Sequence, residues 1–222
     1  MNILAIETSG AVCAVGLLVN GNRFLRTEHV QKRHNERLLP LLEELRDQAG
    51  FDQKQLLDAL DVVAFGRGPG SFTGVRIAAA AAQALALAAN GRVLPISSSE
   101  VLAMQALESQ SDAAGVLTSI RSRRNLYFLA AYRNDGGVPF RELADVLHEA
   151  SPEEAFYQRH EDWLLAGEAA PWWVGPPAVA PSGDAGALLS LGQRYFSLGG
   201  DLDPAEGLPD YPEGEIPWKK NR

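Results

Sequence analysis

Short apolar runs separated by polar turns dominate the beginning of the chain. Residues 2–8 and 12–19 are apolar runs of strand length. Asn20-Gly21, between the second run and residues 23–30, is a typical two-residue hairpin turn. The chain is therefore predicted to open with three antiparallel strands in a meander.

Helical spacing replaces this pattern at residues 33–49, where apolar residues recur at intervals of three and four: Leu38, Leu41, Leu42, Leu45 and Ala49. Gly50 ends this predicted helix, and Pro40 inside it predicts a kink or a start nearby, because proline lacks the N–H. A strand at 62–66, a helix at 71–89 and a strand at 92–96 follow. This order is typical of a ribonuclease-H-like lobe with a mixed sheet.

The second half has weaker patterns, and the polar residues 97–99 predict a boundary before it. Its predicted elements are a helix (100–108), strands (115–120 and 125–132), a helix (152–159), a strand (162–166), a proline-rich loop (171–182) and a helix (184–198). From Gly199 an extended tail is expected. We predict an α/β fold with two lobes, each a mixed sheet flanked by helices: 1–98 and a reduced lobe, 99–222. The last helix and tail, about 184–222, are candidates for packing back on the first lobe.

The glycine-rich segment Gly66-Arg-Gly-Pro-Gly-Ser-Phe-Thr-Gly74 lies between a strand and a helix, where backbone N–H groups can bind phosphate. It matches neither a Walker loop, nor Gly-x-Gly-x-x-Gly, nor a nucleophile elbow. Pro69 also removes one N–H group. These features favour a tight corner in which Ser71 caps the following helix.

That helix, residues 71–89, is apolar around most of its circumference. One stripe holds Val75, Ala78, Ala82, Leu85 and Ala89, and another holds Ile77, Ala81, Ala84 and Ala88. A helix of this kind must be covered on two sides, and its alanines allow another helix to approach closely. The sheet can supply one cover, whereas the second is either the helix at 33–49 or another protein.

Composition excludes several classes of function. The net charge, 20 minus 28 or −8, argues against nonspecific nucleic-acid binding over the whole surface. No run reaches the length of a membrane helix, and the start of the chain does not resemble a signal peptide. The single cysteine, Cys13, lies in an apolar run, which predicts burial and fits a reducing cytoplasm. The predicted localisation is therefore cytoplasmic.

Candidate chemistry is sparse. The four histidines, His29, His34, His148 and His160, have no metal-pair spacing, and the adjacent carboxylates at 43–44 and 153–154 suit solvated helix faces. The basic residues of 121–124 favour a solvated hairpin, with contact to an acidic partner or an RNA backbone as the alternative. No catalytic, cofactor-binding or metal-binding residue is predicted.

Three motifs together resemble a known family. They are Ile3-Leu-Ala-Ile-Glu7-Thr-Ser, Gly66-Arg-Gly-Pro-Gly-Ser-Phe-Thr-Gly-Val-Arg-Ile77 and the terminal Trp218-Lys-Lys. They are similar to those of the TsaB (YeaZ) family, accessory proteins of bacterial tRNA threonylcarbamoyladenosine synthesis. The middle block is specific to this family, and the first is shared with wider actin-like relatives.

The resemblance implies an actin-like fold and a noncatalytic scaffold that activates TsaD, the enzyme that modifies adenosine beside the anticodon of tRNAs reading ANN codons. It implies no metal site, since only His34 stands on the helix where TsaD has two histidine ligands, with Arg37 and Leu38 at the second position. It implies a heterodimer with TsaD, a homodimer in its absence, TsaE as a further partner and tRNA contact only through the complex. The predicted interface, on helices 33–49 and 71–89, comprises Leu38, Leu41, Leu42, Leu45, Phe72, Val75, Arg76, Ala78, Ala79, Ala82 and Leu85.

Two positions depart from the family pattern: Arg121 replaces an aspartate, and Glu213 replaces an arginine. A second hypothesis, an actin-like ATPase or kinase acting alone, rests on Glu7-Thr-Ser and on the glycine turn. A third, a peptidase, has no support in the sequence.

Overall fold

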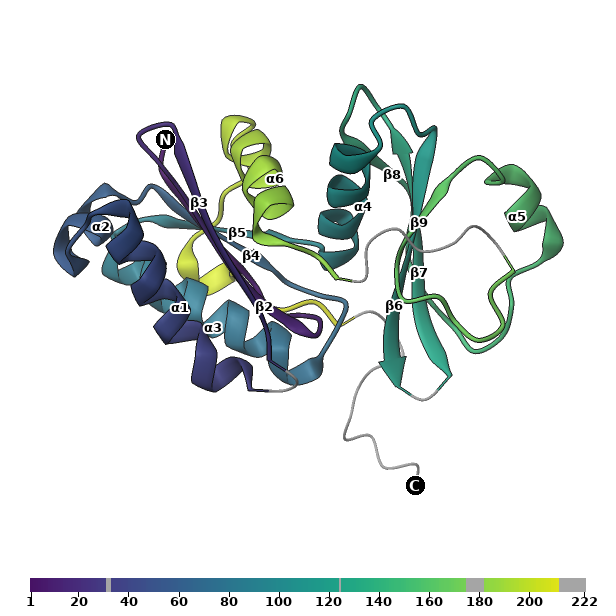
Figure 1. Cartoon of the computed structure of the whole chain (residues 1–222), viewed down its shortest axis with the longest axis horizontal. Coiled ribbons are helices and arrows are strands. Elements are labelled where there is room, and N and C mark those ends of the chain that lie inside the picture. The colour runs from purple at the N-terminus through teal and green to yellow at the C-terminus, as the bar shows by residue number, and fades with distance from the viewer. Residues whose placement is uncertain (31–32, 124, 175–181, 212–222) are drawn as a thin grey trace.

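The computed structural model describes residues 1–30, 33–123, 125–174 and 182–211. These residues form two mixed sheets with helices on their faces and between them (Figure 1). This is the predicted actin-like arrangement of two ribonuclease-H-like lobes. No helix in the described part of the chain is both long and apolar enough to span a bilayer.

The first sheet has the strand order β3-β2-β1-β4-β5. Its strands are β1 (Ile3–Glu7), β2 (Val12–Val19), β3 (Asn22–His29), β4 (Val62–Gly66) and β5 (Arg92–Ile96). The predicted hairpin between β2 and β3 is confirmed, with Asn20 and Gly21 both at positive φ, 51° and 80°. β1 pairs antiparallel with β2 and parallel with β4, and all three strands are buried along their length.

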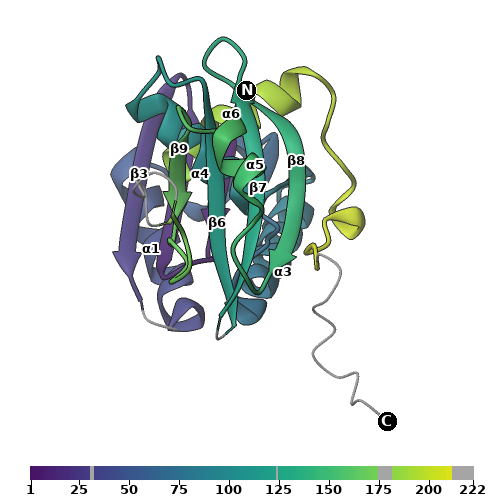
Figure 2. The same ribbon diagram turned by 90° about the vertical axis from the view of Figure 1, so that its right-hand side faces the viewer.

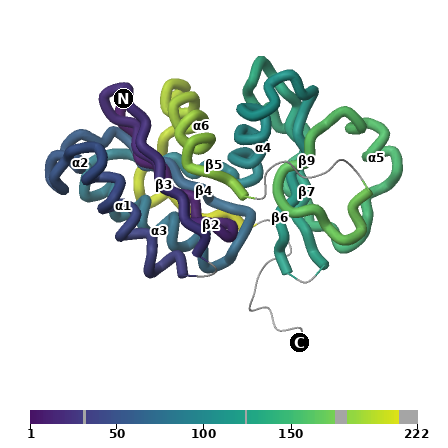
Figure 3. The backbone as a smooth tube through the Cα atoms, viewed as in Figure 1, coloured from purple at the N-terminus to yellow at the C-terminus, as the bar shows by residue number. Residues whose placement is uncertain are grey.

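Helices cover both faces of this sheet. On one face, α1 (His34–Ala49) and α3 (Phe72–Ala88) share a core with side chains of β1, β2 and β4. On the other face, α6 (Ala185–Ser197) buries Leu188, Leu189 and Leu191 against the same strands. In Figure 3 the yellow-green α6 lies beside the purple and blue strands of the first lobe.

One helix of the first lobe escaped sequence prediction, and another differs from it in detail. α2 (Gln53–Ala59) is seven residues long and buries no side chain, so it has no apolar stripe. Its detectable signature is the capping box formed by Asp52 and Gln55. The helix predicted at 33–49 begins at His34 and runs through Pro40, and Gly50 ends it in the left-handed conformation.

The second sheet has the order β8-β7-β6-β9, which Figure 2 shows face-on. Its strands are β6 (Gly115–Arg123), β7 (Leu126–Asn134), β8 (Pro139–His148) and β9 (Leu164–Gly167), with α5 (Glu154–Arg159) between β8 and β9 in the chain. β8 was not predicted, because it is an edge strand in which only Pro139 is fully buried and exposed residues are apolar as well as charged. Its sequence therefore lacks a buried apolar face.

The helix α4 (Ser98–Ser109) lies between the two sheets, next to α6 (Figure 1). It shares a core with β6 and β7 of the second lobe. The Ser190 hydroxyl on α6 donates to the Glu108 carboxylate on α4 at 2.6 Å. The residues predicted as a polar break, 97–99, instead supply the N-cap and first turn of α4.

The tail differs from the expectation of an extended segment. Leu202 forms a β-bridge with Val93 on the edge strand β5, and the short helix η1 (Pro204–Glu206) packs against α3. Asp210 N–H donates to Arg67 O at 2.8 Å, and Arg76 Nε–H donates to the Tyr211 hydroxyl oxygen at 2.7 Å. Residues 202–211 therefore lie on the first lobe. Polar contacts and single apolar side chains hold them there, and such contacts leave no periodic pattern in the sequence. The predicted features at Glu213 and Trp218–Lys220 lie outside the described residues.

The position of α6 on the first sheet predicts a strong effect of one core substitution. Leu188→Ala should lower the free energy of unfolding by about 3 kcal/mol, since Leu188 is fully buried against β1 and β4. Leu198→Ala, just beyond the helix at a side chain 69% exposed, should cost less than about 0.5 kcal/mol. Urea denaturation measures both, and equal losses would contradict this packing.

Candidate partner interface and interlobe cleft

Helix α3 buries one side in the protein's own core. Val75, Ala78, Ala79, Ala82 and Ala86 are each at most 3% exposed and face the first sheet. This stripe follows the three-and-four spacing of a helix face that packs on a sheet. Its alanines let α3 lie close to the strands.

The opposite side of α3 is exposed and carries small side chains. Thr73, Ala80, Ala84, Leu87 and Ala88 are exposed, and Leu87 is 74% exposed. We call these five residues the outer face of α3. Such a face allows close approach of another helix, because its side chains project little.

Most of the predicted interface residues do not lie on this surface. The prediction was based on apolar stripes, and these stripes face the sheet. Seven of the eleven predicted residues are therefore buried in the protein's own core: Leu38, Leu41, Leu45, Val75, Ala78, Ala79 and Ala82. The other four, Leu42, Phe72, Arg76 and Leu85, are partly or fully exposed.

The sequence reasoning took the strongest apolar stripe for the interface, whereas that stripe is the one that packs inward. The predicted set left out the exposed outer face of α3 and Leu39 of α1, which is 63% exposed. The detectable signal was the second alanine stripe, which contains Ala84 and Ala88.

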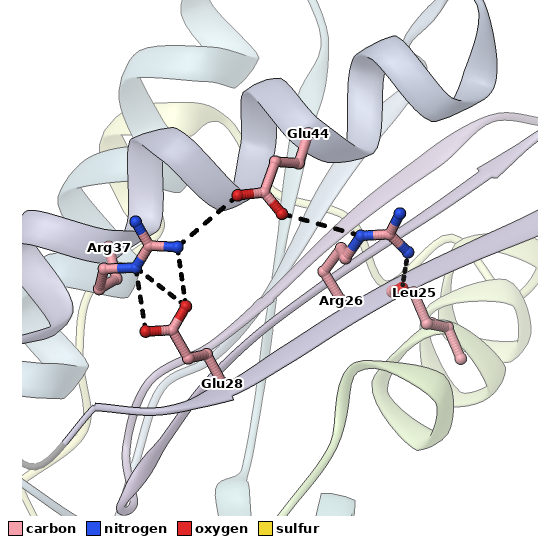
Figure 4. A network of polar contacts seen from close by, with 5 residues as sticks. All are labelled: Leu25, Arg26, Glu28, Arg37 and Glu44. Carbon is pink, nitrogen blue, oxygen red and sulfur yellow. Dashed lines mark hydrogen bonds and ion pairs between the residues drawn. The ribbon is translucent and has the colours of Figure 1, made fainter.

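An ion-pair network holds α1 against the edge strand β3 (Figure 4). The Arg37 guanidinium lies 2.8–3.0 Å from the Glu28 carboxylate and 3.6 Å from Glu44. Glu44 also lies 3.9 Å from Arg26. Arg37 occupies the position where the resemblance would place a second metal ligand, and here its charge fixes a helix on a strand.

The glycine turn between β4 and α3 is shaped by the loop that follows β1. A Cβ atom on Gly66 would lie 2.0 Å from Glu7 Oε2, and one on Gly74 would lie 1.9 Å from the carbonyl oxygen of Thr8. A Cβ on Gly70 would lie 2.5 Å from Ser9 O. Close backbone approach therefore requires Gly70 and Gly74, as the corner interpretation predicted, and Gly66 leaves room for the Glu7 carboxylate.

Hydrogen bonds within the protein occupy several N–H groups of the turn. Ser71 N–H donates to Ser9 O at 2.6 Å, and Gly68 N–H donates to Ser98 Oγ at 3.3 Å. Gly74 N–H donates to Ser71 Oγ at 3.2 Å, which confirms Ser71 as the N-cap of α3. These N–H groups therefore stabilise the turn itself.

The carboxylate of Glu7 is 1% exposed and faces the protein interior. It accepts from Ser9 N–H at 2.7 Å and from the Ser98 hydroxyl at 3.2 Å. Burial raises the pKa of Glu7, and these hydrogen bonds oppose the shift. Glu7 thus joins the ends of β1 and β4 to the start of α4.

The space between the two lobes narrows beside the loop that follows β1. A crevice of about 40 Å³ separates Ser9 and Gly10 from Gly167 and Gly183. It opens into a wider cleft of about 500 Å³, bordered by residues 71–73, by Arg121 and by Glu168. Ligand sites for small molecules usually need at least about 300 Å³, so the crevice itself cannot hold a nucleotide.

His34 lines the wider cleft, and its ring is used by the protein. It is 4% exposed, and its Nε2 lies 3.1 Å from Gly10 O and 3.2 Å from Val12 O. Both partners are acceptors, so Nε2 carries the proton and donates. Among the described residues, no group of three or more His, Cys, Asp or Glu side chains is placed to hold a metal ion.

A buried polar network links α4 to the second sheet. The Ser99 hydroxyl lies 2.8 Å from Asp145 Oδ2 and 2.9 Å from the Tyr132 hydroxyl. The other carboxylate oxygen, Asp145 Oδ1, is buried without a partner among the described residues. Burial raises the pKa of Asp145 to about 6, against the hydrogen bond from Ser99.

Comparison with known proteins gives the family. The model of the TsaD family, tRNA N6-adenosine threonylcarbamoyltransferase, matches residues 26–156. The tRNA threonylcarbamoyladenosine biosynthesis protein TsaB of Haemophilus influenzae is 32% identical over 99% of this chain and 97% of its own length. The chain belongs to the TsaB family.

Another TsaB protein, that of Escherichia coli, is 29% identical over 99% of this chain and 98% of its own length. The solved structure of YeaZ from Pseudomonas aeruginosa superposes with a TM-score of 0.80 at 33% identity, covering 95% of this chain and 99% of that one. A second structure, described as an uncharacterized protein similar to peptidase YEAZ from Pseudomonas aeruginosa, gives a TM-score of 0.82 at 33% identity, covering 95% and 98%. The resemblance inferred from the motifs is confirmed.

The contact between the glycine turn and the loop after β1 predicts opposite effects for two Gly→Ala substitutions in helices. Gly74→Ala should lower the free energy of unfolding by roughly 2 kcal/mol or more, because its Cβ would overlap Thr8 O. Gly192→Ala in α6, whose Cβ would meet nothing closer than 3.4 Å, should be neutral or stabilise by up to about 1 kcal/mol. Urea denaturation measures both, and equal effects would contradict the contact.

The Asp145 network predicts a pH-dependent effect of Asp145→Asn. The folded state holds the Asp145 proton more tightly than the unfolded chain does, so this stabilisation is present at low pH and lost as pH rises through about 6. At pH 7.5 the variant should be more stable than the natural protein by up to about 3 kcal/mol, and below about pH 3 the two should be equal. A stability difference independent of pH, measured by urea denaturation, would contradict the prediction.

Proposed function

We propose that this TsaB-family chain is a noncatalytic scaffold that binds and activates TsaD in the threonylcarbamoylation of adenosine beside the anticodon of tRNAs that read ANN codons. The names of its relatives and the match to the TsaD family model support a place in this pathway. The match also supports a partner of related fold, because two chains of one fold can pair through equivalent helices.

The outer face of α3 is the observation that carries this proposal. One side of the helix fills the core of the first lobe, so the helix is rigidly held while Ala80, Ala84 and Leu87 remain exposed. An exposed row of alanines next to a leucine suits packing against a partner helix at short interaxial distance. Leu39 and Leu42 on the neighbouring α1 extend the apolar surface.

Several groups that a catalytic relative would need are occupied here, which supports a noncatalytic role. The Glu7 carboxylate is buried between Ser9 and Ser98. The Nε2 atom of His34 donates to backbone carbonyls, and Ser71 N–H is bonded to Ser9 O. Each of these groups stabilises the fold instead of facing a substrate.

In this proposal the same outer face forms a homodimer when TsaD is absent, and TsaE joins the assembled complex in the cytoplasm. Transfer RNA is contacted only through the complex. The net charge of −8 supports this last point, because phosphate neutralisation requires an excess of basic side chains.

One observation favours the second function, an actin-like nucleotide-binding enzyme acting alone. The cleft of about 500 Å³ beside Ser71 and Arg121 is large enough for a nucleotide. ATP hydrolysis by the isolated chain, lost on Arg121→Ala, would support that function over a scaffold.

The scaffold proposal predicts that Ala84→Asp on the outer face of α3 prevents formation of the complex with TsaD and abolishes tRNA modification. A carboxylate there would be buried without a partner in the interface, a cost of several kcal/mol. Analytical sizing of a mixture with TsaD and a tRNA modification assay measure the two effects.

Two controls accompany this test. Ala155→Asp places the same charge on an exposed helix, α5, of the other lobe and should leave the complex and the modification intact. Ala82→Asp should unfold the chain, because Ala82 is fully buried in its own core. If Ala84→Asp folds normally and modification continues in an intact complex, the outer face of α3 is not the interface.

A further inference from the structure

Three arginines from three different elements line a second cleft between the lobes, of about 540 Å³. Arg67 follows β4, Arg141 lies on β8 and Arg194 lies on α6. We call this space the arginine cleft. It is bordered by β5, α6 and β8, whereas the cleft beside His34 is bordered by α3 and β6.

The positive charge of the three arginines is not fully neutralised by nearby carboxylates. Among the described residues, the guanidinium groups of Arg141 and Arg194 have no hydrogen bond and no ion pair within 4.0 Å, and both side chains are exposed. Arg67 lies 3.7 Å from Asp210, but its buried Nε has no hydrogen-bond partner. In a chain of net charge −8, the arginine cleft therefore holds two guanidinium groups without an ion-pair partner among the described residues, beside a third that is only partly satisfied.

Two carboxylates border the arginine cleft, those of Glu100 and Asp135, and Asp135 lies 3.4 Å from Arg133, which is not one of the three arginines. Glu100 on α4 accepts a hydrogen bond from the Tyr195 hydroxyl, and the charges of all three arginines act on it. Burial raises the pKa of Glu100, and the arginines oppose that shift. Glu100 and Asp210 together balance two of the three guanidinium groups, so the cleft keeps a net positive charge. Glu100 also offers an acceptor for a ligand hydroxyl.

The rim of the arginine cleft is apolar on both sides. Phe140 on β8 is 54% exposed, and Leu198 beyond α6 is 69% exposed, and both border the cleft. The guanidinium of Arg133 lies 4.9 Å from the centre of the Phe140 ring and packs against one face of that ring. Exposed large apolar side chains beside a charged floor suit a ligand with an anionic end and a flat apolar body.

We propose that the arginine cleft binds a small organic phosphate with a flat apolar body and a hydroxyl group, a molecule with the size and chemistry of a nucleoside monophosphate. A phosphate has three oxygen atoms that can accept from three guanidinium groups, whereas a carboxylate has two. The ligand's hydroxyl would donate to Glu100, and its flat body would lie between Phe140 and Leu198. Because the cleft is built from both lobes, bound ligand would hold them together.

Isothermal titration of the full chain with adenosine 5′-monophosphate, inorganic phosphate and adenosine tests this proposal. We expect one monophosphate per chain, with adenosine and inorganic phosphate each binding at least tenfold more weakly. Arg141→Ala and Arg194→Ala should each weaken monophosphate binding roughly tenfold, the value of one charge-assisted hydrogen bond. Because both side chains are exposed, both variants should fold normally, and their melting temperatures without ligand check this.

Two control variants locate the site. Arg159→Ala removes the same charge from an exposed position on α5 and should leave binding unchanged. Arg121→Ala alters the cleft beside His34 and should also leave it unchanged.

Absence of monophosphate binding at millimolar concentration would overturn the proposal, as would binding that Arg121→Ala weakens and Arg141→Ala does not. Equal affinity for inorganic phosphate would also overturn it, since the apolar rim would then contribute nothing. These outcomes concern the isolated chain and are independent of the pairing with TsaD.

Discussion

The contact between the backbone after β1 and the glycine turn after β4 determines where the rest of the first lobe lies. Thr8 O sits so close to Gly74 that no Cβ can be placed between them, and Ser71 N–H bonds to Ser9 O. Two backbones can approach this closely only where side chains are absent. The parallel strands β1 and β4 thereby end together, and α3 starts at a fixed point and in a fixed direction.

That fixed direction gives the alanines of α3 two different roles. Ala78 and Ala82 let the helix lie close to the sheet. Ala80 and Ala84 lie on the other side, where their small side chains make the outer face apolar and shallow. A small side chain that packs inward and a small side chain that stays exposed look alike in a sequence. Only the position of the sheet separates them, which is why the predicted interface included the buried stripe.

The two lobes meet along surfaces of contrasting chemistry. Beside the loop after β1, the groups that a nucleotide would need, Glu7 and His34, are bonded within the protein. On the side of β8 and α6, Arg141 and Arg194 remain without such partners, and the strand and the helix that carry them lie far apart in the chain. Three basic residues spread from Arg67 to Arg194 in an acidic chain give no local pattern, so the sequence indicated only the adjacent arginines at 121–124.

The sequence by itself determined the opening meander, the hairpin at Asn20-Gly21, the cap at Ser71, the helices at the core and the family, because each rests on local spacing or on a contiguous motif. It did not reveal α2 or β8, which bury too little to leave a period, or the path of residues 202–211 along the first lobe. The tertiary structure alone decided which face of α3 is exposed and which arginines share a cleft. Both depend on contacts between residues far apart in the chain, and no local pattern encodes such contacts.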